Sequence, residues 1–120
     1  MKQKVHSVSY LAKAEFEFKN GVYDLVALPT GAEVVKVSLE VVGNPIAGAV
    51  DVGFKDETSI KNYFLTLDNI TTTRHATSAK DYTATSSKVI VAEVKNANGE
   101  DTKGVLRVLY FLPSVIEVEY

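Results

Sequence analysis

The sequence lacks cysteine and tryptophan altogether and contains a single methionine. Without cysteine, the chain has no thiol nucleophile, no thiolate metal ligand and no disulfide framework. It also lacks an excess of either charge, because 13 Lys and Arg residues face 15 Asp and Glu residues for a formal net charge of -2. This balance removes the broad electrostatic attraction that draws basic proteins to nucleic acid or anionic lipid, so we expect neither as a partner.

Long uninterrupted apolar runs are missing as well. The stretches 22–29 and 105–113 are broken by Asp24 and Arg107, and both are far too short to cross a bilayer. The first residues are basic but lead into alternating polar and apolar positions, which is unlike the apolar block of a signal peptide. We therefore expect a soluble protein that makes no contact with a membrane.

What the sequence has in abundance is β-branched residues, with 18 Val, 5 Ile and 10 Thr among 120 residues. These side chains favour the pleated strand over the helix. Phe16 and Phe18 alternate with Glu15 and Glu17, a period of two that places aromatic rings on one face of a strand and charges on the other. With 46% hydrophobic residues the chain can bury a core of its own, so we predict one domain over residues 1–120.

Turn residues separate these alternating segments. Asn20-Gly21 predicts a tight hairpin that pairs 14–19 with 22–28, since both residue types tolerate positive φ. Further turns are expected at 29–31, 43–45 and 96–99. The Thr-rich and Ser-rich segment from residue 70 to residue 87 predicts a long loop interrupted by one short strand.

The pattern as a whole predicts an all-β fold of about eight to ten strands with no helix longer than about three turns. We expect an antiparallel two-sheet sandwich of jelly-roll type, with a small barrel as the competing architecture. The strands are expected near 4–10, 14–19, 22–28, 33–42, 49–54, 62–68, 80–85, 88–95, 104–112 and 115–120.

A search for reactive groups finds no catalytic arrangement. His6 and His75 lack a second histidine at metal-binding spacing, and each is expected to be exposed and structurally neutral. Asp51, Asp56 and Glu57 surround a glycine and could offer oxygen ligands to a hard cation, but the pattern is not that of an EF-hand and a solvated acidic loop explains it better. We expect no enzymatic activity, no metal and no cofactor.

The segment 105–112 is apolar on both faces, unlike the half-buried strands. In a lone sandwich one face of each sheet meets water, so a second cover is needed, either another subunit or a loop of the same chain. Both explanations stay open. The candidate oligomer interface on this strand consists of Leu106, Val108, Tyr110 and Leu112, or of the residues on its opposite face.

Three segments carry a resemblance to a known group of proteins: Asp24 to Val37 (DLVALPTGAEVVKV), Gly48 to Phe54 (GAVDVGF) and the closing Ile116 to Tyr120. They resemble small β-sandwich structural proteins from the virion modules of tailed phages and prophages, of the capsid decoration or head-fibre type. The resemblance spans most of the chain.

The resemblance implies a non-enzymatic virion protein, made in the cytoplasm of the host bacterium, that forms a symmetric oligomer such as a homotrimer. Its partners would be other copies of itself and a major capsid protein or another virion protein. The alternative from another class is a small lectin-like module that binds a glycan through the 70–87 loop or the 51–57 loop. The absence of tryptophan, a frequent sugar platform, argues mildly against that alternative.

Overall fold

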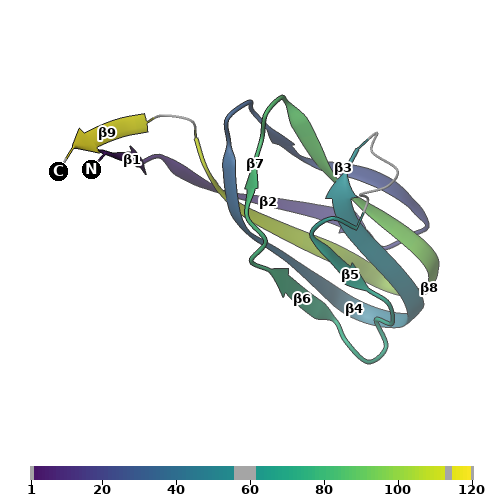
Figure 1. Ribbon diagram of the computed structural model, residues 1–120. Coiled ribbons are helices and arrows are strands. Elements are labelled where there is room, and N and C mark those ends of the chain that lie inside the picture. Colours follow the sequence, from purple (N-terminus) through teal and green to yellow (C-terminus); the bar gives the residue numbers. More distant parts are fainter. Residues whose placement is uncertain (1, 56–61, 113–114, 120) are drawn as a thin grey trace.

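The computed structural model describes residues 2–55, 62–112 and 115–119, and within them nine strands form (Figure 1). No helix of these residues is long and apolar enough to cross a membrane. The described residues form strands and no helix, so the expected all-β fold is confirmed. The strands are β1 (Lys2–His6), β2 (Ser9–Glu17), β3 (Gly21–Leu28), β4 (Glu33–Phe54), β5 (Leu65–Leu67), β6 (His75–Ser78), β7 (Tyr82–Thr83), β8 (Lys88–Phe111) and β9 (Val115–Glu119).

Two very long strands, β4 and β8, organise the sheet. They pair antiparallel from Glu33↔Phe111 at one end to Phe54↔Ile90 at the other. The expected strands 33–42 and 49–54 are thus one strand, and so are 88–95 and 104–112.

The remaining strands of the main sheet add to the two ends of this ladder. At one end, β2 pairs with residues 103–111 of β8, while β6 and β7 pair with the first part of β4. At the other end, β3 pairs with residues 88–94 of β8 and β5 with residues 50–52 of β4. The result is one continuous antiparallel sheet of seven strands that folds over on itself and is nearly closed.

The bend of the ladder lies where turns were expected. The β4–β8 register shifts three times between Val42 and Ala49. Positive φ angles occur on both strands there, at Gly43 (107°), Gly48 (142°), Asn96 (55°) and Asp101 (53°). The prediction that 43–45 and 96–99 end strands is wrong, because each segment bulges and the paired partner continues alongside it. The same residue types that make turns here bend a continuous strand.

The predicted hairpin at Asn20-Gly21 is also wrong. Gly21 has a φ of 148°, but β2 and β3 on either side of it do not pair with each other. Both pair with β8, at opposite ends of that strand. The chain therefore crosses at this point from one half of the folded sheet to the other. The 24-residue strand β8 has β4 along one edge, and β2 and β3 pair with separate stretches of its other edge.

The 70–87 segment is only partly a loop. It contributes β6 and β7, which pair with β4, whereas one strand at 80–85 was expected. Tyr82 of β7 joins an aromatic cluster in which its ring lies 4.6 Å from that of Phe54, and the ring of Tyr63 lies 5.2 Å from that of Phe54. This segment therefore covers an end of the core.

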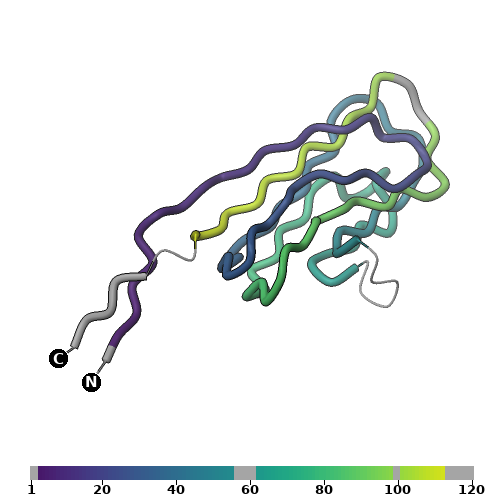
Figure 2. Tube along the Cα trace, turned by 90° about the horizontal axis from the view of Figure 1, so that it is seen from above, coloured from purple at the N-terminus to yellow at the C-terminus, as the bar shows by residue number. Residues whose placement is uncertain are grey.

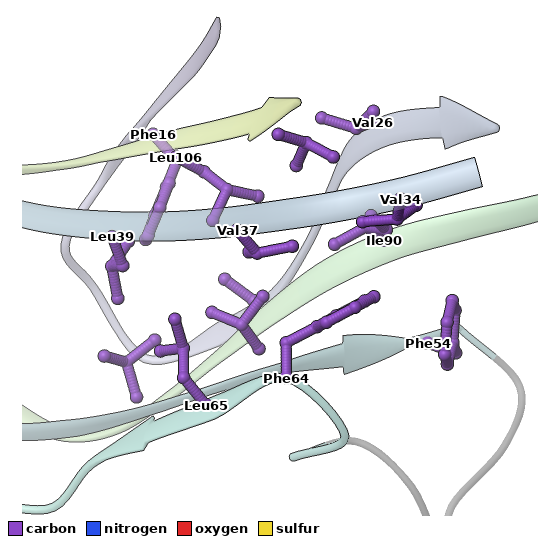
Figure 3. Packing of buried hydrophobic residues seen from close by; sticks show 14 of the residues in the cluster. Phe16, Val26, Val34, Val37, Leu39, Phe54, Phe64, Leu65, Ile90 and Leu106 are labelled. Carbon is purple, nitrogen blue, oxygen red and sulfur yellow. The ribbon is translucent and has the colours of Figure 1, made fainter. Parts of the chain in front are cut away.

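The core fills the space between the two halves of the sheet (Figure 3). Alternation along parts of β4 and β8 buries one face of each strand, including Val37, Leu39, Val52 and Leu106, each exposed by 1% or less. The expected apolar face of 14–19 is confirmed, since Phe16 and Phe18 are buried in this core. Dense apolar packing of this kind is the main stabilising contribution to such a fold.

Gly43→Ala tests the bend. A Cβ at residue 43 would overlap the carbonyl oxygen of Asp101, and the φ of 107° disfavours any side chain. We expect this substitution to lower the free energy of unfolding by at least about 2 kcal/mol in a urea titration. The neighbouring exposed Asn44→Ala should change it by less than about 0.5 kcal/mol, and equal effects of the two substitutions would contradict the bend.

Candidate interaction surfaces

The two histidines and the acidic loop are the residues that were considered for chemistry. The described part of the chain holds no group of three or more His, Asp or Glu side chains that could bind a metal. His75 is exposed on β6, as expected. His6 differs from expectation because it is half-buried, with Nδ1 3.2 Å from the carbonyl oxygen of Leu112. This contact ties the end of β1 to the segment that follows β8, so His6 is not a free surface residue.

Asp51, the candidate cation ligand that lies among the described residues, already interacts with other groups of the protein. The Thr66 hydroxyl donates a hydrogen bond to Asp51 Oδ1 over 2.8 Å. Lys95 Nζ lies 3.0 Å from Glu93 Oε1 and 3.8 Å from Asp51 Oδ2. The hydrogen bond and charge of Glu93, with the charge of Asp51, raise the pKa of Lys95. Asp56 and Glu57, the other two residues of that candidate cation site, lie outside the described residues.

The candidate interface residues on 105–112 mostly point into the chain's own core. Leu106 and Val108 are fully buried, and Tyr110 is 9% exposed with its ring 5.9 Å from that of Tyr10. Leu112 is half-buried against the core. The chain's own folded sheet therefore already covers the side chains on this face of the strand.

Along the same strand, Arg107, Leu109 and Phe111 of the opposite phase are partly exposed, whereas Val105 of that phase is buried. Leu109 lies in register between Leu11 of β2 and Lys36 of β4, and Arg107 lies between Lys13 and Ser38. We call the surface formed by Leu11, Lys36, Ser38, Arg107 and Leu109 the outer-face groove; its volume is about 280 Å³.

The outer-face groove combines apolar and cationic groups. Leu11 is 63% exposed, an unusually open position for a leucine within a strand. Arg107 Nη1 lies 3.3 Å from Glu40 Oε1, which fixes the guanidinium at the edge of the groove, while Lys36 is exposed at the other side. Such a surface suits a protein partner with an apolar anchor and acidic neighbours. The apolar residues on both faces of 105–112 thus identified the strand from the sequence. They did not show which of the two faces is buried in the core.

Two further depressions lie elsewhere. One, of about 600 Å³, runs along the neighbouring edges of β2 and β3 and includes Phe16, Tyr23 and Asp24. Its Asp24 is engaged by Lys55, whose Nζ lies 2.6 Å from Oδ2. The other, of about 370 Å³, lies at the bend beside the exposed Ile46. Both are open surface features formed by strand edges and bends.

Paired substitutions separate the two phases of this strand. Val108→Asp places a carboxylate in the core without a partner, so we expect it to lower the free energy of unfolding by about 4 kcal/mol or more. Leu109→Asp places the same group on the outer face beside Lys36 and Arg107, and should cost less than about 1 kcal/mol. Guanidinium unfolding curves of the two variants measure the difference, and a reversed order would refute the assignment of faces.

Comparisons with known proteins identify relatives of the whole chain. No protein-family model matches the sequence, and no curated protein matches it significantly. Among solved structures, a chain of the acidic stable capsid structure of Helicobacter pylori bacteriophage KHP30 is 76% identical, with a TM-score of 0.91 and full coverage of both chains. A chain of the cyanophage Pam1 capsid asymmetric unit shares the fold at 20% identity, with a TM-score of 0.70 over 88% of this chain and 85% of the other. The chain belongs to the same family as the KHP30 capsid chain, a family of bacteriophage capsid proteins.

Proposed function

We propose that the protein is a non-enzymatic structural component of a phage head, a decoration or head-fibre subunit that assembles as a homotrimer. The observation that carries this proposal is the 76% identity, over the full length of both chains, to a chain of the KHP30 capsid. Its partners are other copies of itself and a major capsid or other virion protein. It is made in the cytoplasm of the host bacterium and works in the virion.

Several features of the chain support this role. A continuous antiparallel sheet around a dense apolar core gives a rigid body that needs no cofactor. The net charge of -2 gives the body no general attraction to the packaged nucleic acid or to a membrane. An accessory subunit of a shell has to bind many equivalent sites, and one repeated surface on a symmetric oligomer does this efficiently.

The proposal extends to the architecture that the sequence predicts, a two-layer sandwich. We propose to regard residues 1–120 as one jelly-roll-like domain whose two layers are the two halves of the folded sheet. In this description the bends of β4 and β8 carry the chain from one layer to the other. The alternative small barrel would need hydrogen bonds between β2 and β3, which the described pairing does not include.

We propose that the subunit contact includes the outer-face groove. The doubly apolar strand called for a second cover, and only its outward phase is available to another chain, because Leu106 and Val108 are already buried. Leu11 and Leu109 offer the apolar anchor of that contact, and Arg107 with Lys36 offers charges at its rim.

The first experiment measures assembly in solution and on the shell. Multi-angle light scattering at micromolar concentration should report three copies of the 13.1 kDa chain. Phage shells assembled without this chain should then bind the purified protein until a fixed ratio to the major capsid protein is reached. A monomer that shows no saturable binding to such shells would refute the proposal.

A variant of the outer-face groove tests where the contact lies. The double substitution Leu11→Asp and Leu109→Asp places two carboxylates at its centre, so we expect sedimentation velocity to show a shift toward monomer while circular dichroism stays that of the folded chain. The control is Val22→Asp, which alters an apolar residue of β3 that is 48% exposed outside the groove. A double variant that sediments like wild type would exclude this surface as the contact.

A further inference from the structure

The β1–β9 pair forms a separate two-stranded ribbon. Its five register pairs run from Lys2↔Glu119 to His6↔Val115. It extends away from the folded sheet, beyond the ends of β2 and β8, and this extension helps to give the chain its 55 × 24 × 18 Å outline (Figure 1). Seen from above, β1 likewise runs outward from the body of the molecule (Figure 2). At its base the Leu112 N–H donates to the Val8 carbonyl oxygen over 2.8 Å, so the ribbon continues the direction of the β2–β8 ladder.

Both outer edges of the ribbon are open. No other strand of the described residues pairs with β1 or with β9. A two-stranded sheet is marginal in water, and a third strand or a packed face is normally needed to hold it. The unpaired N–H and carbonyl groups along each edge are a template for a further strand. The ribbon therefore offers two edges to which a further strand could add.

The two edges differ in charge. The β1 sequence, Lys-Gln-Lys-Val-His, contains two lysines and no acid, and the β9 sequence, Val-Ile-Glu-Val-Glu, contains two glutamates and no base. In the ribbon, Lys2 is in register with Glu119 and Lys4 with Glu117. A β1 strand from another copy of this chain would repeat these opposite-charge pairs along the free edge of β9. Pairing of like edges, as in a two-fold dimer, would place lysines opposite lysines or glutamates opposite glutamates, which is destabilising.

We infer that the ribbons of neighbouring copies join edge to edge, with β9 of one copy beside β1 of the next. When copies are related by rotation about an axis parallel to the ribbon, every β1 runs in one direction and every β9 in the other. The new pairs are then antiparallel, like the pair within one chain. Three copies give a ring of six strands without a free edge.

The register also groups three of the apolar residues of the ribbon at alternate positions, while Val115, opposite His6, lies outside this group. Val5 lies opposite Ile116, and Val118 lies opposite Gln3. Residues at these alternate positions belong to one phase of each strand, and the lysines and glutamates belong to the other. A ring has an inside and an outside, which gives the apolar phase a place away from water. The inference rests on the proposed trimer for the number of copies, but the choice of partner follows from the edges themselves.

Single-cysteine variants test the pairing, because the natural chain has no cysteine. Lys4→Cys in one chain and Glu117→Cys in another put one thiol on each register partner, in different molecules. The two chains, one lengthened by a tag, are produced together, purified and oxidised, and then separated on a non-reducing gel. We expect a mixed disulfide between the two chains, with little disulfide when either variant is produced alone.

The matched control uses an opposite-charge pair on the body. Lys55 Nζ and Asp24 Oδ2 lie 2.6 Å apart within one chain, so Asp24→Cys and Lys55→Cys in separate chains should give no mixed disulfide. A second ribbon pair, Gln3→Cys with Val118→Cys, guards against a local failure of the first. A mixed disulfide from either ribbon pair supports the inference.

Two results would overturn it. One is disulfide formation by each ribbon variant alone, which would mean that like edges pair. The other is an oligomer of normal mass in which neither ribbon pair yields a mixed disulfide. That second outcome would leave the proposed capsid function standing. Conversely, a protein that forms the mixed disulfide but fails to bind shells would support the ribbon ring and refute the capsid role.

Discussion

The antiparallel pairing of β4 with β8 is the interaction on which the rest of the structure depends. Every other strand of the main sheet pairs with one of these two, so none has a place without them. The pairing brings together residues far apart in sequence, such as Glu33 with Phe111. Closing such long loops costs conformational entropy, which burial of the alternating apolar residues on both strands must offset. The bend at Gly43 and its neighbours then turns a flat ladder into a folded sheet that encloses its own core.

This construction determines which surfaces remain for other molecules. Folding buries the inward-facing side chains of β4 and β8, including Leu106 and Val108. It leaves the outer-face groove exposed on one side, and it leaves the edges of the β1–β9 ribbon without partners among the described strands. Both are suited to contacts with other proteins, which is the role expected of a part of a shell.

Much of the fold could be predicted from the sequence because it follows from local rules. Period-two alternation located the strands around Phe16 and Val37, and a run that is apolar on both faces located the strand around Leu106. The turn at 29–31 stands where expected between β3 and β4. Prediction from local sequence failed where the same residue types are compatible with two different backbone structures. Glycine and asparagine near residues 43 and 98 serve a bend as readily as a turn. Asn20-Gly21 connects strands that pair elsewhere, since a distant strand competes successfully for both.

The candidate site was predictable only in part, for a related reason. A strand that is apolar on both faces is visible in the sequence, but which face the core takes depends on how the sheet folds over. The ribbon could not be predicted from its residues, because the charge difference between 2–6 and 115–119 is informative only once the two segments are known to pair.

Imaging of the intact phage particle by electron cryomicroscopy tests directly whether this protein is a subunit of the phage head. We expect density for this fold on the head shell, in clusters of three copies around local three-fold axes. Shell density that contains no copy of this fold would contradict it.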